Sequence, residues 1–279
     1  MKRIQSQTMA EFLIQMIAQT QCNSLTGIDD SKPPIVISPP EQILQMEYLL
    51  HERPTSAAVR QFLNANGGVW DVAGGSGHIS AALSVRGIRC TVIDPRATAG
   101  QLPRRDRKAY AKDVHQALLR AQQTCLPILE PAATDDDDLS PRPTSSPCIP
   151  LFDTVRAWLG NRPEGVDETF RNIDQAPLPV LNAAECSAMV ALHPDEATDA
   201  IVDLAVRYQV PFCIVPCCVF GRLFPDRRTI GGTPVSTLSD LLDYLQAKHP
   251  SIQRATLSFP GANTILWSTF GQECDTGEG

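Results

Sequence analysis

Residues 69–94 place the strongest constraint on how this chain can fold. A short apolar run at Val69–Ala73 leads into the glycine-rich turn Gly74–Gly77, and residues 78–85 have the composition of a short helix. A second apolar run at 89–94 ends in an aspartate. A helical crossover between two such strands makes them neighbours in one parallel sheet. The pattern therefore predicts a βαβ unit with both strands buried.

The carboxyl-terminal half of the chain repeats this alternation. Residue patterns predict strands at 188–192, 212–215, 253–259 and 264–270, and helices at 196–208 and 238–248. The last two strands are joined through Pro260-Gly261-Ala262-Asn263, which is typical of a hairpin. We therefore expect an α/β fold, with a Rossmann-like, doubly wound and mostly parallel sheet that ends in an antiparallel hairpin.

The middle of the chain is less regular. We expect a short strand at 149–152 and helical pieces at 152–159 and 168–173. The segment near 130–148 contains four consecutive aspartates and several prolines, and its composition predicts an unstructured insertion. The predicted division is residues 1–40 as an amphipathic helix and linker, 41–272 as the main domain with that insertion, and 273–279 as a tail.

Composition bounds the class of protein. The chain has 279 residues, of which 43% are apolar, so it can bury a core. A net charge of −7 argues against a surface that binds nucleic acid everywhere, although it allows a local basic patch. Several of the nine cysteines lie in apolar runs, which favours reduced thiols and an intracellular protein. No run approaches the roughly 18 apolar residues of a membrane span.

The first 20 residues have apolar side chains at helical spacing. Lys2 and Arg3 are opposed only by Glu11, so a mitochondrial presequence is one interpretation. Such presequences are usually richer in arginine, and we therefore favour the cytoplasm over the mitochondrion. The other interpretation is a helix that packs on the domain or on a protein partner.

Ligands of parallel α/β sheets bind at the carboxyl ends of the strands. The first such end carries Asp71-Val72-Ala73-Gly74-Gly75-Ser76-Gly77, where small residues allow a ligand close to the backbone. Asp94 ends the next strand, where a carboxylate can accept hydrogen bonds from two ribose hydroxyls. There is no GxxxxGK[ST] phosphate loop, so the pattern does not favour NTP hydrolysis.

This spacing resembles the first motif of the class I S-adenosylmethionine-dependent methyltransferases, D/E-x-G-x-G-x-G. The resemblance implies that Asp71, Ala73, Gly75 and Gly77 form a loop for S-adenosylmethionine and that Asp94 holds its ribose. Ala73 replaces the first glycine, a mild change provided that its φ stays negative.

Two further segments strengthen the resemblance. Leu192–Thr198 and Val215–Cys218 are similar to strand ends in the methyltransferase family that includes the eukaryotic tRNA acceptor-stem ribose 2′-O-methyltransferase. The similarity covers residues 55–96 and 187–270, and it implies an RNA substrate. The zinc-finger modules of the tRNA enzyme are missing, and no Cys/His group has ligand spacing along the chain, so we expect no metal.

Candidate catalytic groups follow these two strand ends. His193 and Asp195 stand where a base could receive the proton of an acceptor oxygen or nitrogen. The alternatives are a structural histidine and a helix N-cap aspartate. Cys217 and Cys218 are interpreted as the pocket wall; the alternative is a thiolate that attacks C6 of a pyrimidine.

Two basic groups could contact a polyanionic substrate. One lies between Arg104 and Lys112, and the other comprises Arg222, Arg227 and Arg228, just after the cysteine pair. Charge runs also occur as simple solvated faces, which is the alternative interpretation.

Two functions remain open from the sequence. The first is an S-adenosylmethionine-dependent methyltransferase that acts on RNA, and the second is a catalytically inactive methyltransferase-like binding or assembly module. They differ at Asp94, because a catalyst needs its carboxylate available for the cofactor. A nicotinamide-dependent oxidoreductase is disfavoured by the glycine spacing and by the terminal hairpin.

Overall fold

The computed structural model describes residues 2–26, 56–125, 151–159, 181 and 183–271. These residues contain a seven-stranded sheet with the order β3-β2-β1-β4-β5-β7-β6. Strands β1 to β5 run parallel to one another, and β7 runs antiparallel to both β5 and β6. The predicted fold class, a doubly wound and mostly parallel sheet ending in an antiparallel hairpin, is confirmed. The strands are β1 (Val69–Val72), β2 (Cys90–Ile93), β3 (Asp153–Val155), β4 (Ala188–Leu192), β5 (Phe212–Val215), β6 (Gln253–Thr256) and β7 (Thr264–Ser268).

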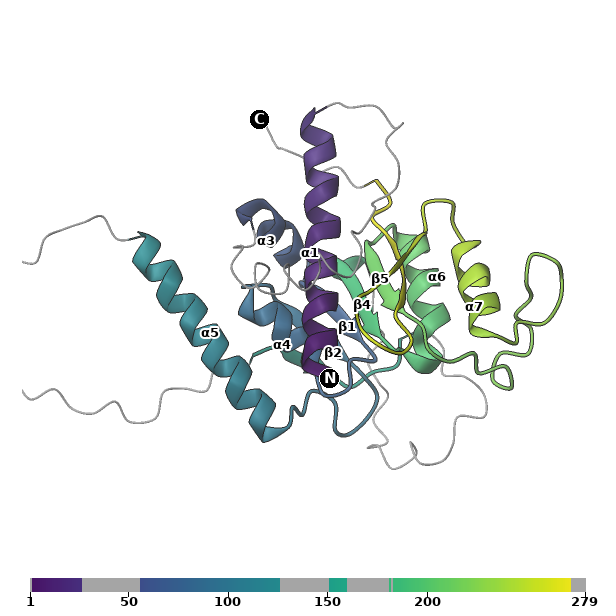
Figure 1. The fold of residues 1–279 in the computed structure, drawn as a ribbon, viewed down its shortest axis with the longest axis horizontal. Coiled ribbons are helices and arrows are strands. Elements are labelled where there is room, and N and C mark those ends of the chain that lie inside the picture. Colours follow the sequence, from purple (N-terminus) through teal and green to yellow (C-terminus); the bar gives the residue numbers. More distant parts are fainter. Residues whose placement is uncertain (1, 27–55, 126–150, 160–180, 182, 272–279) are drawn as a thin grey trace, which may run out of the picture.

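Helices cover both faces of the sheet (Figure 1). The α-helices are α1 (Lys2–Thr26), α3 (Ala57–Asn64), α4 (His78–Val85), α5 (Arg104–Cys125), α6 (Thr198–Tyr208) and α7 (Leu238–Gln246). Two separate apolar clusters fill the space between the layers. Alternate residues of one strand enter different clusters: Ala188 and Val190 of β4 pack with α1, whereas Met189 and Ala191 pack with α6 and α7. Strand β4 is therefore apolar on both sides.

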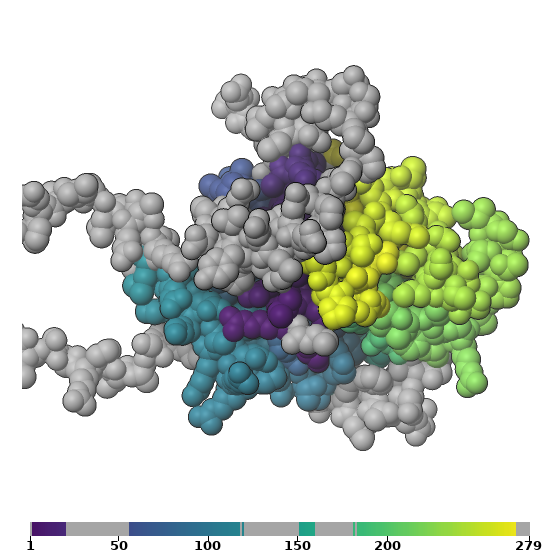
Figure 2. All heavy atoms as spheres, in the orientation of Figure 1, coloured from purple at the N-terminus to yellow at the C-terminus, as the bar shows by residue number. Residues whose placement is uncertain are grey.

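The amino-terminal helix α1 belongs to the core of this domain. Its residues Met9, Leu13 and Ile17 are buried in the same cluster as α4 and β4. Phe12 meets Trp267 of β7 edge to face, with ring centroids 5.9 Å apart. In Figure 2, α1 (purple) lies between the teal helices and the yellow carboxyl-terminal hairpin. The apolar face of the helix thus packs on its own domain, and a protein partner for α1 stays a prediction.

The edge strand β3 lies later in the chain than the sequence pattern predicts. Its residues are Asp153–Val155, and residues 156–159 are not helical, so the predicted helix at 152–159 is wrong. The strand at 149–152 is also wrong in its described part, because residues 151 and 152 form a bend. Asp153 and Thr154 are exposed, and backbone pairing with β2, rather than apolar side chains, makes this segment a strand. The predicted insertion near 130–148 and the helix at 168–173 lie outside the described residues.

The strand order defines one point where a ligand site is expected. From β1 the chain moves to one side of the sheet to form β2 and β3, and it then crosses to the other side of β1 to form β4. The carboxyl ends of β1 and β4 therefore flank the topological switch point. None of the helices within the described ranges is long and apolar enough to cross a bilayer.

The packing of α1 can be tested by truncating one buried side chain. Leu13 is fully buried, so Leu13→Ala is expected to lower the free energy of unfolding by about 2–5 kcal/mol in urea denaturation. Ile4 lies on the same helix with 53% of its surface exposed, and Ile4→Ala is expected to change it by less than about 0.5 kcal/mol. Equal effects of the two variants would contradict this packing.

Candidate functional site

The loop after β1 has a left-handed backbone at three positions. Ala73, Gly75 and Gly77 have φ of 52°, 55° and 81°. The expectation that Ala73 keeps a negative φ is wrong, because the backbone turns directly after β1 while the Ala73 N–H still donates to the carbonyl of Ile93 at 2.8 Å. An alanine in this conformation is strained by about 1–2 kcal/mol. The motif's first glycine is thus replaced at a position where glycine would be favoured.

Asp71 lies fully buried beneath this loop. Its Oδ2 accepts hydrogen bonds from the Ser80 N–H at 3.1 Å and the Ser80 hydroxyl at 2.9 Å, so the carboxylate caps the first turn of α4. A Cβ on Gly74 would collide with the Asp71 carboxyl group. Asp71 Oδ1 is buried and has no hydrogen-bond partner among the described residues. Asp71 therefore supports the loop from below, and burial raises its pKa from 3.8 to about 7.

Asp94 closes the loop from the end of β2. Its Oδ2 accepts from the Gly75 N–H at 3.0 Å and from Arg96 Nη2 at 2.6 Å, while Oδ1 accepts from Arg96 Nε at 2.9 Å. The carboxylate is 1% exposed and both of its oxygens are engaged. The expectation of an available Asp94 is therefore not met in this structure, because the guanidinium fork two residues later matches the carboxylate in a bidentate pair. Hydrogen bonds to Asp94 raise the pKa of Arg96.

His193 follows β4 at the other side of the switch point. Its backbone N–H donates to the Val215 carbonyl at 3.0 Å, and its φ is 57°. Its Nδ1 is buried without a hydrogen-bond partner within the described part of the chain. Burial lowers the pKa of His193 below the usual value, an effect that the charge of Asp195 partly opposes. The imidazole is therefore neutral at pH 7 and able to accept a proton.

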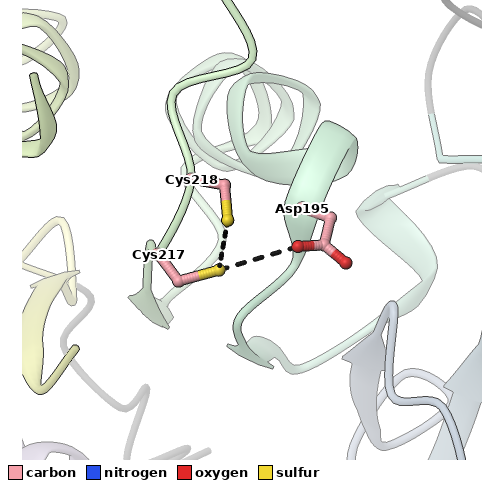
Figure 3. A group of neighbouring side chains, drawn as sticks. All are labelled: Asp195, Cys217 and Cys218. Carbon is pink, nitrogen blue, oxygen red and sulfur yellow. Dashed lines mark hydrogen bonds between the residues drawn. The ribbon is translucent and has the colours of Figure 1, made fainter. Parts of the chain in front are cut away.

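Asp195 is not the N-cap that the alternative interpretation proposed. Pro194, and not Asp195, is the residue that precedes the 3₁₀ turn Asp195–Ala197. The backbone carbonyl of Asp195 accepts a hydrogen bond from the Thr198 hydroxyl at 2.7 Å. The carboxylate is exposed and points toward Cys217 (Figure 3). Asp195 also has a positive φ of 49°. Strained residues of this kind concentrate at functional sites.

The cysteine pair lies beside Asp195. The Cys217 thiol is 3.6 Å from Asp195 Oδ1 and 3.3 Å from the Cys218 sulfur (Figure 3). Burial, together with the neighbouring Cys218 and Asp195, raises the pKa of Cys217. The alternative of a thiolate nucleophile is therefore disfavoured, because a thiol with a raised pKa stays protonated at neutral pH.

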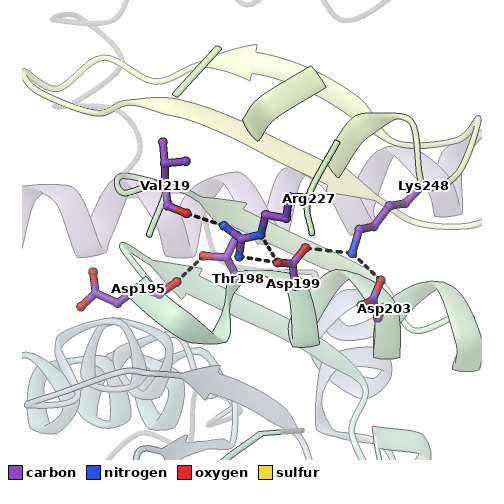
Figure 4. Close-up of polar contacts among 7 residues, drawn as sticks. All are labelled: Asp195, Thr198, Asp199, Asp203, Val219, Arg227 and Lys248. Atoms are coloured by element: carbon purple, nitrogen blue, oxygen red, sulfur yellow. Dashed lines mark hydrogen bonds and ion pairs between the residues drawn. The ribbon is translucent and has the colours of Figure 1, made fainter. Parts of the chain in front are cut away.

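The three arginines after the cysteine pair differ in exposure. Arg227 is buried: its Nε donates to Asp199 at 2.6 Å and its Nη1 donates to the Val219 carbonyl (Figure 4). Lys248 joins the same network through Asp199 and Asp203. The proposed contact of Arg227 with RNA is thus wrong in this structure, since its guanidinium lies inside the domain. Arg222 and Arg228 are exposed.

Sequence reasoning placed the loop and the two strand ends correctly but missed their partners. Ser80 and Arg96 each engage a predicted cofactor residue, and a single sequence gives no sign that Arg96 folds back on Asp94. The contact between Asp195 and Cys217 joins residues 22 positions apart, so it depends on the pairing of β4 with β5.

No family model matches the sequence, and no curated protein matches it. Among solved structures, the chain is similar to the C-terminal domain of precorrin-6Y C5,15-methyltransferase from Rhodobacter capsulatus. The identity is 13%, the alignment covers 78% of this chain and 90% of that one, and the TM-score is 0.26. The strand order by itself defines the fold class.

The strain at Ala73 predicts a stabilising substitution. Ala73→Gly removes the Cβ from a left-handed residue, and we expect the free energy of unfolding to rise by about 1 kcal/mol, seen as a higher melting temperature. A lower melting temperature for Ala73→Gly would contradict the positive φ. The matched control is Ala81→Gly in the middle of α4, where glycine is expected to lower the melting temperature.

The buried carboxyl of Asp71 predicts a pH dependence of stability. Its pKa is about 7 in the folded chain and near 3.8 when exposed, so between these values the folded state holds a proton that the unfolded state releases. Stability from this group therefore falls as pH rises from about 4 to 7, by on the order of 4 kcal/mol. Asp71→Asn should remove that loss.

The measurement compares urea denaturation of the wild type and Asp71→Asn at several pH values. The variant is expected to gain stability relative to the wild type as pH rises toward 7. The control variant is Asp240→Asn. Hydrogen bonds from Thr237 and Ser236 lower the pKa of Asp240, so its contribution to the free energy of unfolding is constant above about pH 4. A difference between wild type and Asp71→Asn that does not change with pH would refute the raised pKa.

Proposed function

We propose that the chain is an S-adenosylmethionine-dependent methyltransferase that acts on RNA. One observation carries the proposal: the glycine loop after β1, Asp94 after β2 and His193 after β4 follow the carboxyl ends of three neighbouring strands around the topological switch point of the sheet. This is the edge at which α/β sheets bind their ligands. Four non-glycine residues with positive φ also follow strands at this edge, namely Ala73, His193, Asp195 and Phe220.

The residues of the loop fit such a cofactor. Gly75 and Gly77 bring the backbone close to neighbouring groups, because a Cβ on Gly77 would collide with Phe152 and one on Gly75 would crowd Arg96. Asp71 Oδ1 is a buried acceptor without a partner in the described chain. Asp94 would hold the ribose hydroxyls, and Asp71 would support the loop and α4. When bound, S-adenosylmethionine supplies a methyl group already activated on a sulfonium, so the protein mainly has to align the acceptor.

His193 is the proposed proton acceptor. It is neutral at pH 7 because burial lowers its pKa, and its Nδ1 is unpaired within the described chain. Asp195 lies close enough to affect the pKa of His193, and its charge favours the imidazolium that forms when the proton arrives. We therefore assign proton transfer to His193 and a supporting electrostatic role to Asp195.

Exposed arginines and lysines support RNA as the substrate class. Arg222 and Arg228 border the strand end that carries the cysteine pair. The first half of α5 adds a second exposed basic surface, formed by Arg104, Arg105, Arg107, Lys108 and Lys112. Contacts between basic side chains and phosphates supply most of the affinity of nonspecific nucleic-acid binding.

Arg96 must leave Asp94 before ribose hydroxyls can take its place. The Arg96 side chain is 48% exposed, so it can turn toward solvent, whereas the Asp94 carboxylate is held by the Gly75 N–H. Arg96 is therefore expected to compete with the cofactor for Asp94, and removing its guanidinium should strengthen cofactor binding.

The test is calorimetric titration of the whole chain with S-adenosylmethionine and S-adenosylhomocysteine. We expect binding at micromolar concentrations, loss of binding in Asp94→Ala, and about fivefold or greater tightening in Arg96→Ala. No binding at millimolar ligand to a folded protein would reject the enzyme and leave the methyltransferase-like binding or assembly module. With binding established, transfer of a labelled methyl group to RNA, reduced by Arg222→Glu and Arg228→Glu, tests the substrate class.

A further inference from the structure

Three side chains with metal-binding atoms converge at the carboxyl ends of β4 and β5. Asp195 follows β4, and Cys217 and Cys218 follow β5, and the ligand atoms of all three lie within 4.8 Å of one another (Figure 3). Because β4 and β5 are parallel neighbours, their ends bring together residues that are 22 positions apart in the chain. Asp195 and Cys218 are exposed and Cys217 is half-buried, so an ion can reach the group from solvent.

The spacing of these atoms is close to that of a tetrahedral metal site. With metal–sulfur and metal–oxygen bonds of about 2.3 and 2.0–2.2 Å, a tetrahedral ion separates its sulfur and oxygen ligands by roughly 3.5–3.7 Å and two sulfurs by roughly 3.8 Å. Cys217 and Asp195 are 3.6 Å apart, and the two sulfurs are 3.3 Å apart. Two of the three separations are therefore close to tetrahedral values, and the third pair, Cys218 and Asp195, lies within 4.8 Å.

The two segments that carry these residues are fixed to each other. Val219 is next to Cys218, and its carbonyl accepts from Arg227, whose guanidinium also pairs with Asp199 in the first turn of α6 (Figure 4). The Thr198 hydroxyl holds the Asp195 carbonyl at 2.7 Å. The group is thus connected through a buried ion pair rather than placed on two independent loops, and such preorganisation favours ion binding.

We propose that Asp195, Cys217 and Cys218 bind a thiophilic divalent cation, with Zn²⁺ the first candidate. Two thiolates and a carboxylate suit zinc, whereas calcium and magnesium prefer oxygen ligands alone. On binding, the two thiols would release their protons to solvent, and the dication would offset two of the three negative charges of the ligands. Three protein ligands leave one tetrahedral position for water or a substrate atom. The inference departs from the expectation of no metal, which considered ligand spacing only along the chain.

This site shares Asp195 with the proposed methyl transfer but is tested separately from it. None of its three ligands belongs to the cofactor loop, and His193, the proposed proton acceptor, is not a member of the group. Metal binding and S-adenosylmethionine binding are measured separately, so the failure of one proposal is distinguishable from the failure of the other.

The test is a titration of the full-length reduced chain, in a non-thiol reductant, with Zn²⁺ and with Cd²⁺ as a spectroscopic probe. We expect one equivalent of Zn²⁺ bound with a Kd of about 1 μM or tighter, and a cadmium–thiolate charge-transfer band that saturates at one equivalent. The double variant Cys217→Ser, Cys218→Ser is expected to weaken binding at least about 100-fold, and Asp195→Asn about tenfold or more.

The matched control is Cys186→Ser. Cys186 is buried away from this group, and its thiol donates to the Ala183 carbonyl, a contact that serine can replace. This variant should bind the metal like the wild type. Absence of the cadmium band in the wild type, or tight binding that survives both the double cysteine variant and Asp195→Asn, would overturn the proposal. Melting curves without metal verify that each variant is folded. If the double cysteine variant is unfolded, the cadmium band of the wild type and the metal affinity of Asp195→Asn test the proposal.

Discussion

Parallel pairing of β1 with strands on both of its sides is the constraint on which the rest of this structure depends. Val69 lies opposite Cys90 of β2 and opposite Ala188 of β4, so one buried strand joins the two halves of the chain. Parallel strands end at the same edge of the sheet. The loops after β1, β4 and β5, which carry the candidate functional residues, therefore open at that edge. The helices α1, α4, α6 and α7 complete the cores on the two faces and hold this edge in place.

The carboxyl edge of the sheet combines strained backbone conformations with buried, hydrogen-bonded carboxyl groups. Ala73, His193 and Asp195 hold left-handed backbone conformations that cost free energy, and the surrounding hydrogen bonds maintain them. Asp94 is closed by Arg96 and by the Gly75 N–H, while Asp71 remains buried with one oxygen unpaired in the described chain. A ligand that displaces Arg96 would exchange one set of hydrogen bonds for another. In this structure the loop is therefore closed by Arg96 at Asp94.

Much of the fold followed from the residue pattern, and the reason is local. The runs 69–73, 188–192 and 212–215 are apolar apart from Asp71 because both faces of the sheet are covered, which is a clear signal for buried parallel strands. The edge strand β3 has no such signal, because backbone pairing alone defines it, and its position was therefore predicted wrongly. The sequence also could not show that Arg222 is exposed and Arg227 is buried, because both belong to the same run of basic residues.

The sequence by itself determined the βαβ unit, the terminal hairpin and the three strand ends that carry Asp71 to Gly77, His193 to Asp195, and the cysteine pair. These features depend on periodicity, glycine placement and apolar runs, which are properties of neighbouring residues. Tertiary structure alone decided which side chains meet there. It buried Arg227 against Asp199 and brought Asp195 to Cys217, because these contacts depend on strand register and on loops that fold back across the edge. The pairing of Arg96 with Asp94 is local, but it depends on how the backbone turns after β2.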